Sequence, residues 1–134
     1  MYKRQLYEGV VYGHLDHVNR LKAAGAQMNL ARLTGGGARS AGWTQMFADA
    51  LEMPIEVPAT SEIAALGAAI AAGIGVGAYT DYADAVAQTV HVVRRHEPQA
   101  EATAKYLARY QEYLCLLEAM REPWRRLEKL SAQK

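Results

Sequence analysis

Residues 33–40 have the sequence Leu-Thr-Gly-Gly-Gly-Ala-Arg-Ser, and this stretch decides how the rest of the chain is interpreted. A short apolar run at residues 28–33 leads into it and is predicted to be a buried strand, and Ser40 can cap a helix after it. Glycines between a strand and a helix allow positive φ and let a ligand approach the main chain closely. The free N–H groups and the positive end of the helix then favour a phosphate or a polar ribose. A tight turn without a ligand is the alternative, because glycine is also a common turn former.

Two better-known nucleotide motifs are absent. A Walker A loop ends in Gly-Lys-Ser or Gly-Lys-Thr, whereas residues 37–40 are Gly-Ala-Arg-Ser. The Gly-Ile-Gly-Val-Gly stretch at residues 73–77 lacks the third spacing of a dinucleotide fingerprint, and we expect it to close a helix rather than to follow a strand. Residues 33–40 therefore remain the segment that carries the nucleotide hypothesis.

Outward from the glycines, the hydrophobic pattern predicts an α/β chain rich in helices. Helices are expected at 2–24, from Ser40 to beyond Leu51, from a cap at Thr60 or Ser61 to about residue 72, at 82–91 after Asp81, and after Pro98, with a second short strand at 55–57. Two strands joined through a helix predict a parallel pair with a right-handed crossover. Such a pair is too small to stand alone, so the chain is interpreted as part of a larger α/β domain.

The last helix carries a regular apolar seam. Steps of four and three residues separate its members, which are Tyr106, Tyr110, Tyr113, Leu117, Met120, Trp124 and Leu127. This spacing is typical of coiled-coil packing, and a structural role is favoured over a functional one. Pro123 is expected to interrupt the helix, and Cys115 is expected to be a small buried hydrophobe.

Composition excludes several classes of function. The chain has 134 residues, with 15 basic and 14 acidic side chains, so nothing in its charge favours a nucleic-acid or membrane-surface partner. The arginine pairs at 94–95 and 125–126 are interpreted as solvated surface. One cysteine allows no disulfide within the chain, and His14 and His17 have no third ligand nearby, so no metal site is expected. The first residues lack the apolar region of a signal peptide, and a cytoplasmic location is expected.

The chain resembles the FGGY family of carbohydrate kinases along most of its length. The apolar run and Gly-Gly-Gly are followed by Trp43-x-Gln45-x-x-Ala48-Asp49, by Pro-Ile-Glu-Val-Pro at 54–58, and by Glu-x-x-Ala-Leu-Gly-Ala-Ala at 62–69. Glu-Gly-Val-Val at 8–11 and the tyrosine-rich segment at 106–113 add to this resemblance. In combination these motifs are specific to the family. Asp49 is expected to belong to its structural frame, and Glu62 and Gly67 to its packing.

The resemblance implies an actin-like, ribonuclease H-like ATPase fold, of which residues 1–134 would be a single partial domain at the C-terminal end. It implies a kinase that uses ATP with Mg²⁺ and transfers phosphate to a hydroxyl of a sugar or polyol. Gly35, Gly36 and Gly37 would line the adenosine and α-phosphate, with Ser40 near the adenine. Ser40 stands where many members carry Asn. The Arg39-Ser40 pair is similar to L-xylulose-kinase-like or erythritol-kinase-like members, which favours a ketopentose or a tetritol.

The resemblance places the catalytic Asp, the sugar-binding groups and the loops for the β- and γ-phosphates outside these residues, so no catalytic residue is assigned and the chain alone is expected to be inactive. A non-catalytic interaction or regulatory module and an orphaned fragment remain open alternatives. Whether Met1 is a natural start also remains open. Exposed strand edges and the apolar seam lead us to expect association with further copies of the chain.

Overall fold

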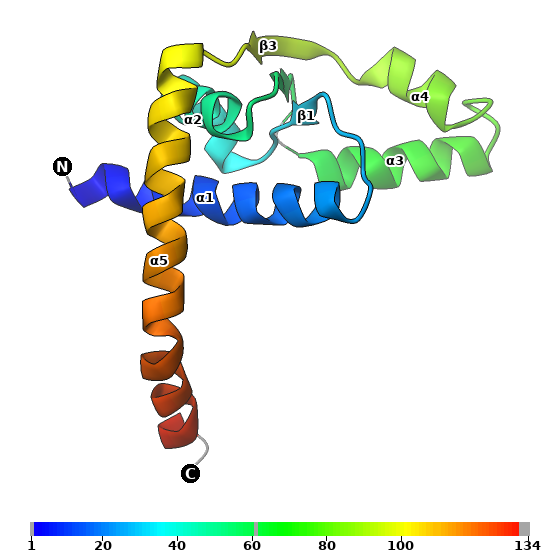
Figure 1. Cartoon of the computed structure of the whole chain (residues 1–134). Helices are drawn as coiled ribbons and strands as arrows, with labels where there is room; N and C mark the ends of the chain where they lie inside the picture. The colour runs from blue at the N-terminus through cyan, green and yellow to red at the C-terminus, as the bar shows by residue number, and fades with distance from the viewer. Residues whose placement is uncertain (1, 61, 132–134) are drawn as a thin grey trace.

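The computed structural model describes residues 2–60 and 62–131 (Figure 1). Its elements, in chain order, are α1 (Tyr2–Ala23), β1 (Ala31–Arg32), the 3₁₀ turn η1 (Gly36–Arg39), α2 (Ala41–Leu51), β2 (Ile55–Pro58), α3 (Ile63–Gly75), α4 (Tyr82–Thr89), β3 (Val92–His96) and α5 (Ala100–Ser131). The prediction of a helix-rich α/β chain is confirmed.

The sheet has three strands in the order β1-β2-β3. The predicted parallel pair is present, with Ala31 opposite Ile55. The third strand, β3, was missed: it runs antiparallel to β2 and pairs His96 with Ile55. The buried strand predicted at 28–33 is wrong in extent, since only Ala31 and Arg32 form it and neither is buried. Strand β1 is an edge strand of this sheet and pairs with β2 alone among the described strands. It is therefore short and accessible.

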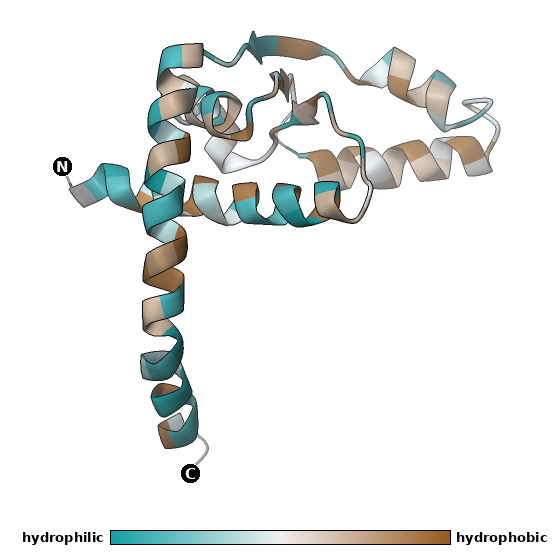
Figure 2. Ribbon diagram, viewed as in Figure 1, coloured by the Kyte–Doolittle hydropathy of each residue, from teal (hydrophilic) through white to brown (hydrophobic). Residues whose placement is uncertain are grey.

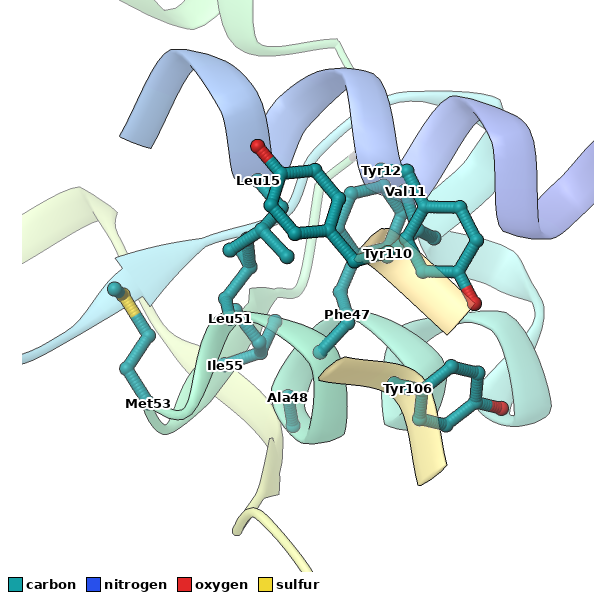
Figure 3. Packing of buried hydrophobic residues seen from close by; sticks show 11 residues of the cluster. Val11, Tyr12, Leu15, Phe47, Ala48, Leu51, Met53, Ile55, Tyr106 and Tyr110 are labelled. Atoms are coloured by element: carbon teal, nitrogen blue, oxygen red, sulfur yellow. The ribbon is translucent and has the colours of Figure 1, made fainter. Parts of the chain in front are cut away.

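The core lies where α1, α2 and the first half of α5 meet β2. Figure 3 shows α1 and α5 side chains converging on α2. The buried members are Val11, Tyr12, Leu15, Phe47, Ala48, Ala50, Leu51, Met53, Ile55, Tyr106 and Tyr110. Beside it, the carboxylate of the buried Glu8 binds Arg4 at 2.7 Å and Arg109 at 2.9 Å, so a charged group clamps α1 to α5.

Polar residues of the Trp-x-Gln-x-x-Ala-Asp motif fasten α2 to the start of α5. Asp49 is buried, and its Oδ1 accepts hydrogen bonds from the Gln45 side chain at 2.8 Å and the Gln99 backbone N–H at 2.9 Å. Its backbone carbonyl accepts a third from the Thr103 hydroxyl at 2.8 Å. These contacts are those of the structural frame expected of Asp49 from the sequence.

Helices α3 and α4 form a pair beside this core (Figure 1). Asp81 caps α4 as predicted, accepting from the Asp84 N–H at 2.8 Å, although α4 ends at Thr89 rather than near residue 91. Of the predicted caps for α3, Ser61 lies outside the described residues, and Thr60 accepts from the N–H of Glu62, the N-cap residue. The expected close packing at Gly67 is wrong for the described residues, since a Cβ there would meet nothing within 4 Å.

Helix α5 runs unbroken to Ser131, so the predicted interruption at Pro123 is wrong. Proline there removes the N–H that would serve the carbonyl four residues earlier, and on an exposed helix water is available to that carbonyl. Cys115 is exposed, which corrects the prediction that it is buried. Across the described ranges, no helix combines the length and the apolar character needed to cross a membrane.

Candidate functional site

The glycine turn lies at the carboxyl end of β1, where the backbone passes into α2 through η1. Leu33 still donates its N–H to the Glu56 carbonyl of β2 at 2.9 Å, which fixes where the turn begins. Gly35 then has φ 78° and ψ −167°, a conformation available essentially only to glycine. The turn therefore requires glycine at residue 35 for reasons of backbone geometry alone.

The three glycines differ in what surrounds them. A Cβ on Gly37 would lie 2.8 Å from the Trp43 ring, so this glycine makes room for a side chain of α2. A Cβ on Gly36 would meet nothing within 4 Å. Gly35 thus serves the turn and Gly37 serves packing, while Gly36 leaves open space through which a ligand could approach the main chain.

Ser40 is the N-cap of α2, as predicted. Its hydroxyl oxygen accepts the Trp43 N–H at 3.3 Å, and its carbonyl accepts from both the N–H and the hydroxyl of Thr44. The residue is exposed, so the hydroxyl hydrogen remains available to a ligand. The structure accounts for serine here through capping.

A hollow of about 210 Å³ lies on one side of the turn, between the ends of β1 and β2 and strand β3. Its lining residues are Leu33, Thr34, Gly35, Ala38, Arg39, Val57, Pro58, Ala59, Thr60, Val93 and Arg94. Gly35 is thus on its wall, whereas Gly36, Gly37 and Ser40 are not among the lining residues. Pockets that bury most of a small ligand usually measure about 300–1,000 Å³, so this hollow alone is too small to enclose a nucleotide.

Arg94 is the residue of this hollow that the sequence analysis missed. Its guanidinium donates from Nη2 to the Ala38 carbonyl and ties β3 to η1, while its Nε is buried without a hydrogen-bond partner. The interpretation of residues 94–95 as solvated surface is therefore wrong for Arg94. It is apt for Arg95, which is exposed and pairs with Glu56 and Glu97. The signal was the alternation in Val-Val-Arg-Arg-His at 92–96, which turns every second side chain inward.

The charge of the hollow suits an anion. The charged residues of its lining are Arg39 and Arg94, with no carboxylate among them. Together with the N–H groups at the start of η1 and α2, these cations favour phosphate oxygens.

A larger hollow, of about 720 Å³, lies between α1 and α5, away from the glycines. Arg4 and Arg109 in its lining both bind Glu8, and Glu112 adds a further carboxylate. The Tyr12 hydroxyl is buried there without a partner, and burial, followed by the charge of Glu8, raises the pKa of Tyr12 to about 12. Volume alone would favour this hollow, but the glycine turn has an open backbone at Gly36 beside a hollow lined by arginines, and we take the turn as the candidate site.

No group of three or more His, Cys, Asp or Glu residues in the described part of the chain is placed to hold a metal ion. His14 and His17 lie with their ring centroids 6.4 Å apart, and the His14 ring packs on Phe47. No ligand for Mg²⁺ is assigned among the described residues of this chain. The exposed turn and the hollow lined by Arg39 and Arg94 fit one face of a nucleotide.

Comparison with known proteins bears on this site. Residues 3–76, which include the glycine turn, match the FGGY family of carbohydrate kinases, C-terminal domain. The L-xylulose/3-keto-L-gulonate kinase of Escherichia coli (strain K12) is 38% identical over 115 residues, which is 86% of this chain and 23% of that kinase. The autoinducer-2 kinase of Yersinia enterocolitica is 39% identical over 85 residues, 63% of this chain and 16% of the kinase.

A solved structure shares the fold. The ligand-bound xylulose kinase of Lactobacillus acidophilus superimposes with a TM-score of 0.80 at 20% identity, over 87% of this chain and 24% of that one. The chain thus spans about a quarter or less of the length of the proteins it matches.

Proposed function

This chain belongs to the FGGY family of carbohydrate kinases, and from that premise we propose that it forms the nucleotide-side, C-terminal part of an ATP-dependent kinase of a sugar or polyol. Residues 1–134 would be one partial domain. The glycine turn carries the proposal, because its backbone is open at Gly36 and the hollow beside it is lined by Arg39 and Arg94 and has no acidic wall.

In this proposal the chain binds and orients ATP and does not react with it. The N–H groups of residues 35–37 would meet the adenosine and α-phosphate side, and Arg94 would hold the turn in shape through the Ala38 carbonyl. Bound ATP would supply the phosphoryl group. The base that deprotonates the sugar hydroxyl and the groups that hold the β- and γ-phosphates would come from outside these residues.

The acceptor favoured is a ketopentose, because the relative with 38% identity is named an L-xylulose/3-keto-L-gulonate kinase. A tetritol, suggested by the Arg39-Ser40 pair, is the second choice. The autoinducer-2 kinase relative suggests a third kind of acceptor, but it matches less of this chain. Since phosphoryl transfer needs nucleotide, metal and acceptor held together, we propose that the chain alone has no kinase activity toward any of them.

Nucleotide binding is the test that this chain itself allows. ATP is titrated against the ¹⁵N-labelled 134-residue chain, with backbone amide shifts as the readout. We expect weak binding, since the hollow is only one wall of a site, with shifts confined to residues 34–43 and β3. The Gly36→Val variant should abolish these shifts, because its side chain would fill the space in front of the turn.

Gly9→Val is the matched control. Gly9 also has no atom within 4 Å of an added Cβ, but it lies on α1, away from the turn. Shifts that survive Gly36→Val or centre on α1 would contradict the assigned site, and complete absence of binding would favour a non-catalytic interaction module. A coupled ADP-release assay with L-xylulose or erythritol tests inactivity, and acceptor-dependent turnover above the protein-free control would overturn it.

A further inference from the structure

Strand β3 contacts the segment that follows the glycine turn through two side chains. Arg94 and His96 are two positions apart, so both side chains lie on the same face of the strand. The Arg94 guanidinium donates to the Ala38 carbonyl in η1. The His96 ring contacts α2, where its Nδ1 lies 2.9 Å from the Gln45 Oε1. Because α2 follows η1 closely in the chain, the two contacts hold β3 against one short segment.

The hydrogen bonds of Gln45 determine which nitrogen of His96 carries the proton. The Gln45 Nε2 donates to the Asp49 Oδ1 and to the Glu97 backbone carbonyl, both at 2.8 Å. A carboxylate and a carbonyl only accept, so reversing the amide would place its oxygen against two others. The Gln45 Oε1 therefore faces His96 and accepts, which requires an N–H at Nδ1. The other ring nitrogen, Nε2, is buried and has no hydrogen-bond partner among the described residues, so the Gln45 contact orients the ring.

The Arg94 contact reaches the turn through a single residue. Ala38 accepts from Arg94 at its carbonyl and donates its own N–H to the Gly35 carbonyl at 3.2 Å. Gly35 has the φ of 78° with which the turn begins. A shift of β3 relative to α2 would therefore displace Arg94 and, through Ala38, the backbone at Gly35. The hydrogen bond between His96 and Gln45 opposes such a shift, because it joins β3 to α2 directly.

We propose that His96 is a positioning residue for the glycine turn: its Nδ1–H, bound to Gln45, fixes β3 in the place from which Arg94 holds Ala38. The consequence for nucleotide binding rests on the function proposed above, whereas the effect on the turn itself does not. When the hydrogen bond is lost, the turn spends a smaller fraction of its time in the conformation that binds. The apparent affinity for the nucleotide falls by that fraction.

The position of the ring proton is tested on the unaltered ¹⁵N-labelled 134-residue chain. Long-range ¹H–¹⁵N correlation spectra at about pH 8.5, where ordinary histidines are neutral, distinguish a ring protonated at Nδ1 from one protonated at Nε2. The chain has four histidines, and the signals of His96 are those missing from the spectrum of His96→Asn. We expect the Nδ1–H form. The Nε2–H form at His96 would overturn the proposal.

Two substitutions test the link between His96 and the turn. His96→Leu removes the donor, and should shift the backbone amides of residues 35–40 and weaken ATP binding about fivefold, the contribution of one ordinary hydrogen bond. His96→Asn keeps an N–H donor at the same distance along the side chain as Nδ1, and should restore both. Arg95→Ala is the matched control, because Arg95 lies on the opposite face of β3 and pairs with Glu56 and Glu97. This control should leave the amides of the turn unchanged, and circular dichroism checks that all three variants keep their helices.

The outcomes separate the role of His96 from the proposed function. Turn amides that respond equally to His96→Leu and Arg95→Ala, or that His96→Asn does not restore, would overturn the positioning role. Equal ATP affinity in the wild type and in His96→Leu would also overturn it, while leaving the proposed function standing. If the wild type binds no ATP but its turn amides respond to His96→Leu and not to the control, the proposed function fails and the positioning role is upheld.

Discussion

Helices α2 and α3 occupy equivalent places in the chain, because each follows a strand of the sheet's parallel pair, yet their burial is opposite. Six of the 11 residues of α2 are buried, including the polar Thr44 and Asp49. All 13 residues of α3 are Ala, Ile, Leu or Gly, and Ile70 alone among them is buried in the part of the chain that the structure describes. In Figure 2, which is coloured by hydropathy, α3 is nearly all brown and pale and has no hydrophilic face.

The difference shows that the burial of these helices depends on which elements lie beside them and not on their own hydrophobicity. Helix α2 lies between α1, α5 and the sheet, whereas α3 is packed mainly against α4. A helix that is apolar all round is normally buried in the core of a larger protein. The exposure of α3 therefore fits a chain that spans 23% of its L-xylulose/3-keto-L-gulonate kinase relative.

The largest expected effect is a loss of stability in α2, the better packed of the two helices. Phe47→Ala removes a buried ring that contacts Trp43 and His14, and should lower the free energy of unfolding by about 3–5 kcal/mol. Ile70→Ala, at the buried position of α3, should cost less, about 2 kcal/mol, since Ile70 has a smaller side chain and is not part of the main core cluster. Urea unfolding followed by circular dichroism measures both. Equal losses would mean that α3 is as firmly packed as α2.

The same contrast explains what the sequence could predict of the fold. Local signals sufficed for α1, for the Ser40 and Asp81 caps and for the parallel strand pair, because each depends on residues near in sequence. Strand β3 was missed because its pairing with β2 is a long-range contact. Cys115 was misjudged because the prediction assumed a surrounding core that the described residues do not place around that part of α5, whereas Pro123 was misjudged because the cost of proline to the helix was overestimated.

For the site, the sequence located the glycine turn but could not distinguish the three glycines. Gly35 is required by its φ and Gly37 by the Trp43 ring, and neither constraint is visible without coordinates. Arg94 was overlooked because its role depends on β3 lying beside η1, more than fifty residues from Ala38 in the chain. The residues at which a ligand could meet the backbone remain a prediction.

A buried carboxylate, Asp49, and an exposed one, Asp81, offer a second and smaller contrast. Asp49→Ala leaves the Gln99 N–H and the Gln45 amide without their shared acceptor in a buried place, and should cost about 2–3 kcal/mol. Asp81→Ala removes the exposed cap of α4 and should cost about 1 kcal/mol. Chemical denaturation of the two variants compares them directly. If Asp81→Ala proved the more damaging, the α3–α4 pair would contribute more to stability than its burial indicates.

Tyr12, in the core beside α2, makes the stability of the chain depend on pH. Its pKa is raised to about 12 in the folded chain, mainly by burial, from an ordinary value of about 10. The folded state therefore holds this proton longer than the unfolded state, so the stability it contributes is complete below about pH 10 and is lost as the pH rises toward 12. Tyr12→Phe also removes a buried hydroxyl that has no partner, and should raise stability at neutral pH by about 1 kcal/mol.

Thermal melts from pH 8 to above pH 10 provide the measurement. The Phe variant should lose less stability than the wild type over this range, with a remaining loss from Tyr110, whose pKa burial also raises. Parallel pH profiles for the two proteins would show that the Tyr12 hydroxyl is solvated and that the core around α2 is looser than its packing indicates.

The smallest expected effect concerns α3 and has the opposite sign. Gly67 lies inside a helix, and an added Cβ would meet no atom within 4 Å, so Gly67→Ala should stabilise α3 in this chain by about 1 kcal/mol through helix propensity alone. Amide hydrogen exchange along α3 should slow about fivefold. Gly73→Ala is the matched control, because its Cβ would lie 2.7 Å from the Tyr79 ring and should force that ring to move, cancelling the gain. If Gly67→Ala instead speeds exchange, residue 67 already has a close neighbour in solution, and α3 is covered, by α4 or by another copy of the chain. If the predicted sign is observed, glycine at residue 67 has no use in the packing of this chain's own described residues.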